Sequence, residues 1–540
     1  MLDEVTVLIP RNEEDGNDVL QDTLDSLPKD KGVSVQVLPY KNGGLSSALN
    51  KGIQEAGTKY VFRLDAGNRL SGNCLDFLVS LAWNANVTYP SSILLSDFGV
   101  PEKSLAAPDF CQERLKRRNC VPVHSLIDRE SLLEMGGYPD RPCLESWDLH
   151  LRLLSAGKKF KAVPEAYVYS YTTPTTIPSH VPREEAERIA KELGATAEEG
   201  KATFIYQASF PTTYYRCLLP AKYLPGVCYN IESFEVSLSE DDKISGFPMQ
   251  EGALILQFPG DVIRAIYAAE MKEAGVPVLV EVDDNYTIST PHKHKGWVKK
   301  ISDDRSTHSL EGHAKIVRIA DGLIVTQQYL ANQYKKFEIP TYICPNQVEP
   351  DDYPKLLKEP GPLKIGWFAS YSHRGDAEKI ERALEWASKQ DDVEIWVMGL
   401  EPHWWKFRFK YIPWTNDLST YHAMASMLDV GVAPVRDDPW SLCRSDLKAL
   451  DYSVQGVAPV LSDNAPYSQW THGDNCLKAK TPKEWLYTLK ELVRDPSAVQ
   501  DLARRANEYV LKERTIEGNC WRWQEALDDC SKRINSASTR

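Results

Sequence analysis

The sequence predicts an α/β protein of about three domains, each built around a mostly parallel sheet. The chain has 540 residues, and a domain usually holds roughly 100 to 200. Short apolar runs alternate with helical stretches, which is the pattern of βαβ units. Two Pro-rich breaks, TTPTTIPSHVP and EPDDYPKLLKEPGP, interrupt this alternation. We therefore expect domains over residues 1–195, 200–355 and 356–540.

The first segment begins with apolar runs at 5–10, 33–38 and 60–65, separated by the helical stretches DVLQDTLDSL and LSSALNKGIQEAG. The second segment alternates TFIYQ, ALILQF, VPVLVEVDD and GLIVT with helices, and the third does the same with KIGWFAS, VEIWVMG, VGVAPV and APVLSD. Ligands are expected beyond the carboxyl ends of such strands.

Composition and charge exclude several classes of protein. Hydrophobic residues make up 42% and charged residues 26%, as in globular proteins rather than disordered ones. The net charge of −13 opposes long-range attraction to nucleic acid or anionic lipid. The eleven scattered cysteines include no C-x-x-C pair, so neither a disulfide framework nor a zinc site is predicted. No secretory signal or membrane-length apolar run is visible, so we expect a cytoplasmic protein without an integral membrane segment.

The first segment carries, in order, IPRNEED, ALNKGI, FRLDAGN, GGYPD and ESWDLHLRLLSAG. This series resembles the family-two, GT-A-type glycosyltransferases. The resemblance implies an Asp-x-Asp that holds a divalent metal and a Glu-Asp-x-Asp that supplies the base. Here Gly67 replaces the second carboxylate after Asp65, and Ser146 stands between Glu145 and Asp148. We favour a degenerate recognition domain over an altered transferase, with Asp65, Glu145 and Asp148 as a candidate ligand site.

Residues 202–530 resemble a complete GT-B-type glycosyltransferase of the family-four kind. The most diagnostic phrase is RSDLKALDYSVQGVAPVLSD. The resemblance implies two Rossmann-like domains with the active site in the cleft between them. It also implies a nucleotide-diphosphate sugar as donor and a hydroxyl acceptor. We expect no required cofactor or metal, because no carboxylate pair at the donor loop is spaced to bridge metal and phosphate. The expected fold is thus a GT-A-like Rossmann-type domain followed by the two Rossmann-like domains of a GT-B fold.

The donor site should lie in the third segment. After the strand KIGWFA, the loop with Ser370, His373 and Arg374 enters a helix whose N-terminal amides favour phosphate. The resemblance places Asp451 at the donor ribose, although the family's first Glu is lost at Cys443. Arg444 and Lys448 are candidates for the diphosphate, because a metal-free site needs cations to stabilise the leaving group. The alternative for Lys448 is a solvated helix face.

Candidate catalytic residues are His373 and the pair Asp283 and Asp284, which end the strand VPVLVEV. These carboxylates would orient an acceptor hydroxyl or act as a base, and ordinary turn chemistry is the equal alternative.

The predicted function is transfer of a sugar to a hydroxyl of a glycan or lipid-linked glycan. The expected acceptor is a surface polysaccharide or lipopolysaccharide intermediate. One alternative is a hydroxymethylated base in phage DNA, with ERLKRR and KHKGWVKK as candidate phosphate tracks. The other alternative is a non-catalytic scaffold that binds a sugar or nucleotide.

Overall fold

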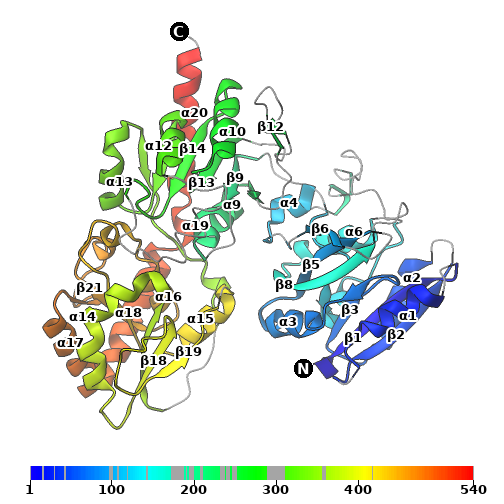
Figure 1. Ribbon diagram of the computed structural model, residues 1–540, viewed down its shortest axis with the longest axis horizontal. Coiled ribbons are helices and arrows are strands. Elements are labelled where there is room, and N and C mark those ends of the chain that lie inside the picture. The colour runs from blue at the N-terminus through cyan, green and yellow to red at the C-terminus, as the bar shows by residue number, and fades with distance from the viewer. Residues whose placement is uncertain are drawn as a thin grey trace. The chain divides into compact units, whose positions relative to one another are not determined.

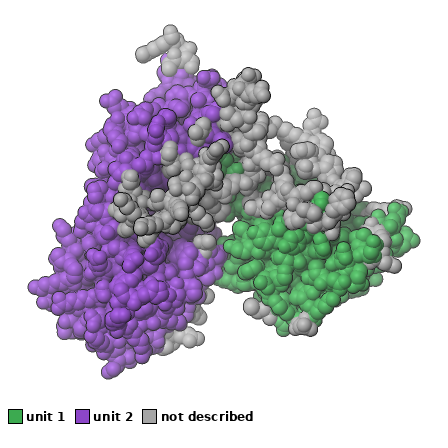
Figure 2. Space-filling view, in the orientation of Figure 1, with its two compact units in different colours: residues 1–200, 227–233 green, residues 201–226, 234–540 purple. Residues whose placement is uncertain are grey.

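The computed structural model shows two compact units (Figures 1 and 2). Unit 1 comprises residues 1–200 and 227–233, and unit 2 comprises residues 201–226 and 234–540. The structure describes residues 2–14, 17–29, 31–41, 44–96, 101–105, 107, 109–117, 119–141, 144–171, 188–189, 191–193, 200–206, 211–231, 237–238, 244–245, 252–258, 260–288, 310–354, 361–415 and 417–538. Among these, no helix is both long enough and apolar enough to cross a bilayer.

Unit 1 is built on one mixed sheet with the strand order β2-β1-β3-β7-β5-β8-β4, and β6 pairs with β5. The strands are β1 (Val5–Asn12), β2 (Ser34–Tyr40), β3 (Tyr60–Arg63), β4 (Arg69–Leu70), β5 (Val87–Leu95), β6 (Pro101–Leu105), β7 (Leu126–Asp128) and β8 (Phe160–Tyr171). The first three strands pair in parallel, as predicted. Strands β4, β6 and β7 pair antiparallel with their neighbours, so the sheet is less parallel than the sequence indicates.

The helices of unit 1 are α1 (Asn17–Asp25), α2 (Leu45–Glu55), α3 (Cys74–Leu81), α4 (Gln112–Arg117), α5 (Arg129–Glu134) and α6 (Glu145–Ser155). Two apolar clusters of buried residues form its core. Leu49 and Ile53 of α2 belong to one cluster, and Leu75 and Leu78 of α3 belong to the other. The spacing of three or four residues within each pair gives each helix one buried face.

The described residues of unit 2 form two large sheets and the two-stranded sheet of β11 (Ser237–Leu238) and β12 (Ile244–Ser245), and we call the part around each large sheet a lobe. The first lobe has five parallel strands in the order β9-β13-β14-β15-β16: β9 (Ala202–Tyr206), β13 (Ala253–Gln257), β14 (Val278–Val282), β15 (Gly322–Val325) and β16 (Thr341–Ile343). Its helical segments are α8 (Pro211–Thr213), the π-helix η3 (Tyr214–Leu218), α9 (Leu219–Tyr223), α10 (Val262–Glu273), α12 (Leu310–Ile319) and α13 (Gln328–Tyr334). The short strands β10 (Gly226–Asn230), β11 (Ser237–Leu238) and β12 (Ile244–Ser245) lie between β9 and β13 in the chain.

The second lobe has six parallel strands in the order β19-β18-β17-β20-β21-β22. They are β17 (Leu363–Ala369), β18 (Val393–Gly399), β19 (Lys410–Ile412), β20 (Val430–Ala433), β21 (Ala458–Ser462) and β22 (Leu477–Ala479). Helices α14 (Ala377–Ala387), α15 (Leu418–Ser426), α16 (Leu447–Val454), α17 (Pro482–Arg494) and α18 (Pro496–Glu513) surround them. The α/β fold class with several parallel sheets is therefore confirmed.

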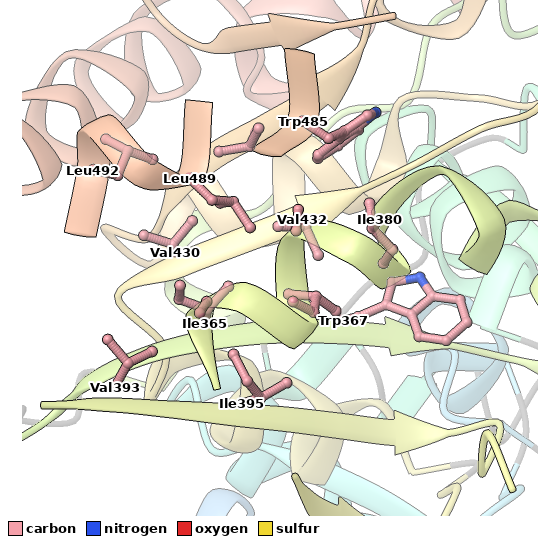
Figure 3. Close-up of a cluster of buried hydrophobic side chains, with 14 of the residues drawn as sticks. Ile365, Trp367, Ile380, Val393, Ile395, Val430, Val432, Trp485, Leu489 and Leu492 are labelled. Carbon is pink, nitrogen blue, oxygen red and sulfur yellow. The ribbon is translucent and has the colours of Figure 1, made fainter. Parts of the chain in front are cut away.

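The core of the second lobe explains why its central strands are nearly all apolar. Ile365 and Trp367 of β17 and Val430 of β20 point toward the same cluster as Trp485 and Leu489 of α17 (Figure 3). All five side chains are buried. A parallel strand covered on both faces has no solvent side, so its sequence reads as a continuous apolar run.

Beyond α18, α19 (Ile516–Asn519) and the long helix α20 (Trp521–Ser538) bring the chain back to the first lobe, where α20 contacts β15 and β16. Tyr342 of β16 donates a hydrogen bond to Asp529 across 2.5 Å, and Cys530 lies against Gly322. The two lobes are thus joined by two stretches of chain, residues 344–362 and 514–520.

Candidate functional site

The candidate site begins where the strand order of the second lobe reverses. From the central strand β17 the chain moves outward to β18 and β19, then returns to β20 on the other side of β17. The loops after β17 and β20 therefore diverge at the carboxyl ends of these strands, where ligands of open α/β sheets usually bind. The 3₁₀ helix η7 (Tyr371–Asp376) and then α14 follow β17, and the 3₁₀ helix η8 (Ser441–Cys443) and then α16 follow β20.

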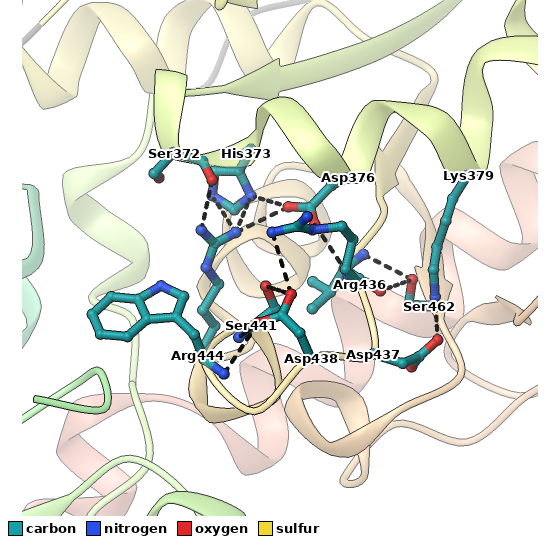
Figure 4. A network of polar contacts seen from close by, with 12 residues as sticks. Ser372, His373, Asp376, Lys379, Arg436, Asp437, Asp438, Ser441, Arg444 and Ser462 are labelled. Atoms are coloured by element: carbon teal, nitrogen blue, oxygen red, sulfur yellow. Dashed lines mark hydrogen bonds and ion pairs between the residues drawn. The ribbon is translucent and has the colours of Figure 1, made fainter. Parts of the chain in front are cut away.

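Three of the predicted donor residues, His373, Arg444 and Lys448, meet beside these loops, and Figure 4 labels the first two of them. Lys448 Nζ lies 2.6 Å from Nε2 of His373. The Arg444 guanidinium donates to a carboxylate oxygen of Asp376 across 2.9 Å and to the carbonyl oxygen of Ser372 across 2.9 Å. His373 Nδ1 lies 2.7 Å from the same oxygen of Asp376. Two cations from the α16 side and one imidazole from the α14 side therefore share one small, largely buried space.

Both ring nitrogens of His373 have close polar contacts: Nδ1 lies 2.7 Å from Asp376 and 2.5 Å from Arg444 Nη1, and Nε2 lies 2.6 Å from Lys448. When Lys448 is charged it can only donate, so Nε2 is then the acceptor and Nδ1–H donates to Asp376. Burial, followed by the charges of Arg444 and Lys448, lowers the pKa of His373 well below its usual value. Burial, followed by the charge of Arg444, also lowers the pKa of Lys448 to about 7. Near neutral pH the imidazole is neutral and Lys448 is close to the midpoint of its titration.

Asp376 supplies a negative charge to this cluster of His373, Arg444 and Lys448. Burial raises its pKa, but the hydrogen bond from His373 and the charge of Arg444 lower it more, and the result is about 2. Its other carboxylate oxygen accepts the backbone N–H of Arg436 across 3.0 Å. The carboxylate thus holds His373 and Arg444 in place and stays ionised near neutral pH.

Asp283 and Asp284 follow β14 of the first lobe. Tyr286 donates to Asp283 across 3.1 Å. Oδ1 of Asp284 is buried and has no hydrogen-bond partner among the described residues. Burial, followed by the charge of Asp283, raises the pKa of Asp284 to about 7, whereas the charges of Arg444 and Lys448 lower it. Asp284 is therefore close enough to interact electrostatically with both cations of the other lobe.

A buried ion pair supports the end of β14. Arg216 donates to Glu281 across 2.6 Å, and both side chains are almost fully buried. Arg216 also donates to the carbonyl oxygen of Cys344 and to the side chain of Asn346. The pKa of Glu281 is about 7, because burial raises it more than Arg216 lowers it. This pair ties β14 to η3 and to the first connection between the lobes.

Asp451 lies deeper, in a cluster of aromatic side chains. Oδ1 accepts hydrogen bonds from the hydroxyls of Tyr215 across 2.7 Å and Tyr353 across 2.8 Å. Nε2 of His422 lies 2.9 Å from the Tyr215 hydroxyl, and the His422 ring stacks on Tyr353. Asp451 is 2% exposed. It therefore does not share the cluster formed by His373, Arg444 and Lys448.

The other two predicted donor residues, Ser370 and Arg374, lie nearer the surface than this cluster. Ser370 shares a hydrogen bond of 3.0 Å with the hydroxyl of Ser372. Arg374 is exposed, lies 4.9 Å from the centre of the Trp404 ring, and contacts the Tyr371 hydroxyl across 3.4 Å. Its guanidinium therefore belongs to the outer rim of the η7 turn.

In unit 1, two of the three predicted residues meet around a buried arginine. Arg63, at the end of β3, donates to both oxygens of Asp65 across 2.6 and 2.9 Å. It also donates to Glu145 across 3.0 Å and to the Ser146 hydroxyl across 3.1 Å. The guanidinium thus neutralises Asp65, which in the resemblance would hold a metal, and Glu145, which belongs to the motif that would supply the base, so these residues do not fit a divalent cation.

Asp148 does not join them. It pairs instead with Arg141 across 2.9 Å and with Arg152 across 2.8 Å. Within the described part of the chain, no group of histidine, cysteine and carboxylate side chains is arranged to hold a metal ion.

The candidate DNA tracks gain no support. In α4, Glu113 pairs with Lys116 across 2.6 Å and with Arg117 across 2.9 Å, so these cations are already engaged. The track at 293–300 lies outside the described residues.

Sequence reasoning missed three residues that organise the site: Asp376, Tyr353 and Arg63. Asp376 directly precedes α14, a position that reads as ordinary helix capping. Tyr215 is predicted from the sequence either to stack on a sugar or base or to pack in the core, with neither favoured. A signal did exist for Arg63, since it is a charged residue inside an otherwise apolar strand.

Comparisons with known proteins give only distant structural likenesses. No protein-family model matches the sequence, and no curated protein matches it significantly. HepE of Anabaena, solved in complex with UDP, is 12% identical over 61% of this chain and 100% of its own, with a TM-score of 0.43. Sucrose-phosphate synthase of Thermosynechococcus elongatus is 12% identical over 51% of this chain and 73% of its own, with a TM-score of 0.37. A UDP-forming α,α-trehalose-phosphate synthase of Burkholderia xenovorans is 11% identical over 62% and 99%, with a TM-score of 0.43.

Proposed function

We propose that unit 2 is a glycosyltransferase that moves a sugar from a nucleotide diphosphate to an acceptor hydroxyl. The observation that carries this proposal is the cluster of Arg444, Lys448 and His373 at the reversal point of the second sheet. Two cations beside the start of a helix form an anion site, and Asp284, whose Oδ1 has no hydrogen-bond partner among the described residues, interacts electrostatically with both of them from the other lobe.

In the proposed reaction the bond between the sugar C1 and the diphosphate oxygen breaks, and a bond from C1 to the acceptor oxygen forms. Arg444 and Lys448 stabilise the negative charge that develops on the departing diphosphate. Lys448 then donates to phosphate instead of His373, whose Nε2 becomes an acceptor for a sugar hydroxyl. Asp284 receives the acceptor's proton, since a carboxylate with a pKa of about 7 is suited to that transfer near neutral pH.

We propose a cytoplasmic protein that acts on a glycan or lipid-linked glycan, such as a surface polysaccharide or lipopolysaccharide intermediate. Modified DNA fits less well, because the net charge is −13 and the cations of α4 are engaged by Glu113. Unit 1 is proposed to contribute recognition, because Arg63 occupies its carboxylate site.

The test is binding followed by turnover. The full chain is titrated with UDP, GDP and ADP by calorimetry, and hydrolysis of the corresponding nucleotide sugars is measured with the wild type and with the Arg444→Met and Asp65→Ala variants. We expect one nucleotide to bind, Arg444→Met to weaken binding about tenfold or more, and Asp65→Ala to behave as wild type. Loss of activity in Asp65→Ala with retention in Arg444→Met would move the active site to unit 1. Absence of binding to all three nucleotides would refute the proposal.

A further inference from the structure

One residue of the first lobe reaches the core of the second. Tyr215 lies in the π-helix η3, and its hydroxyl donates to Oδ1 of Asp451 in α16 across 2.7 Å. Tyr353, between the two sheets in the chain, donates to the same oxygen across 2.8 Å. Tyr215, Asp451 and His422 are each 2% exposed, and Tyr353 is 5% exposed. This buried contact connects the lobes at Asp451, the residue that the family resemblance places at the donor ribose.

The protons of this cluster follow from its geometry. A carboxylate carries no proton, so both tyrosine hydroxyls donate to Oδ1. The single proton of the Tyr215 hydroxyl is then used, and the 2.9 Å contact with Nε2 of His422 requires that His422 donates. Oδ1 of Asp451 therefore accepts hydrogen bonds from both tyrosine hydroxyls, and the Tyr215 hydroxyl in turn accepts one from His422. Neither hydroxyl bonds Oδ2, which is the oxygen left for an external donor.

We propose that Tyr215 is a positioning residue for the nucleotide. By fixing Oδ1 it sets the rotation of the Asp451 carboxylate, so that Oδ2 is held in place for a ribose hydroxyl. The terminal torsion of aspartate is otherwise broad, and a carboxylate that is already oriented loses less entropy when it binds. Because Tyr215 belongs to the first lobe, nucleotide affinity in the second lobe depends on contact between the two. This inference rests on the proposed function and adds its ribose-positioning residue.

The test combines a hydroxyl deletion in the protein with one in the ligand. The full chain is titrated with whichever of UDP, GDP or ADP binds most tightly, and with its 2′-deoxy and 3′-deoxy forms. The variants are Tyr215→Phe and, as a matched control, Tyr214→Phe. Tyr214 is the neighbouring tyrosine of η3, and its hydroxyl donates to Asp352 rather than to Asp451. Thermal unfolding of each variant separates loss of fold from loss of binding.

We expect Tyr215→Phe to weaken binding of the ribonucleotide about tenfold or more, since the lost hydrogen bond has a charged acceptor. At least one deoxy form should bind the wild type about tenfold more weakly, and this discrimination should nearly vanish in Tyr215→Phe while Tyr214→Phe retains it. A merely structural role would weaken all the nucleotides equally. Equal weakening, or affinity unchanged in Tyr215→Phe, would overturn the inference alone. A wild type that binds no nucleoside diphosphate would overturn the proposed function as well.

Discussion

Nucleotide binding should become weaker as the pH rises above 7, and Lys448 should be one cause. Its pKa in the unliganded protein is about 7. At pH 8 only about one molecule in ten then carries the charge, and at pH 9 about one in a hundred. A bound diphosphate favours the charged lysine, so its pKa rises in the complex and a proton is taken up. Affinity is therefore full below pH 7 and lost progressively above it.

The size of the loss in nucleotide affinity follows from the pKa of Lys448. Restoring the charge on Lys448 costs about 1.4 kcal/mol at pH 8 and about 2.7 kcal/mol at pH 9, or one factor of ten in Kd per pH unit. Asp284, with a pKa of about 7, adds a second dependence of the same sign, because an anion beside it also favours its protonated form. The slope of log Kd against pH should thus approach two in the wild type.

The assay is calorimetric titration between about pH 6 and pH 9, repeated in buffers of different ionisation enthalpy to count the protons taken up. Lys448→Arg keeps the charge at every pH and should lower the slope by about one. The control is Lys379→Arg in the same lobe, a lysine that pairs with Asp437 across 2.8 Å and should leave the slope unchanged. A slope that is the same in Lys448→Arg and in the wild type would refute the reasoning.

Three further predictions concern stability and metal dependence. Gly431→Ala should destabilise the second lobe by about 1–3 kcal/mol in denaturant unfolding, because its Cβ would lie 2.3 Å from the Tyr452 ring, whereas Gly361→Ala meets no atom within 4 Å and should have little effect. Arg63→Met should lower the free energy of unfolding by about 3–5 kcal/mol, because it leaves the carboxylates of Asp65 and Glu145 without their cation. The control is Arg141→Met, at a more exposed arginine, which should lower it less. An Arg63→Met variant as stable as the wild type would contradict the neutralisation that we describe. Transfer should persist in excess chelator, and a complete loss that Mn²⁺ restores would implicate a metal.

The sequence predicts the buried strands well and the sheet edges poorly. Strands β17 and β20 are covered on both faces, so burial itself leaves a continuous apolar run in the sequence. Strand β19, at the sheet edge, contains the partly exposed Lys410 and Tyr411. It is a strand because its backbone pairs with β18, and this backbone hydrogen bonding does not require a particular pattern of side chains.

The candidate site also contains residues that the sequence predicts and contacts that it does not. Arg444 and Lys448 are four residues apart, and the cation requirement of a diphosphate is enough to select them. Their convergence on His373 depends on residues more than 70 positions earlier in the chain. Asp451 shows the limit more clearly. Its motif indicates a ribose ligand, but its partner Tyr215 is 236 positions away. The pairing of α16 with η3 could therefore not be predicted from local sequence.

The return of α20 to the first lobe also limits how the lobes can move. Two stretches of chain join them, one after β16 and one after α18. Two connections restrict the relative motion of the lobes more than one would, and rotation about the line through both connections strains them least. Opening and closing of unit 2 should then follow a single angular coordinate. Cutting the chain before Trp521 would remove one connection, and the first lobe would gain rotational freedom.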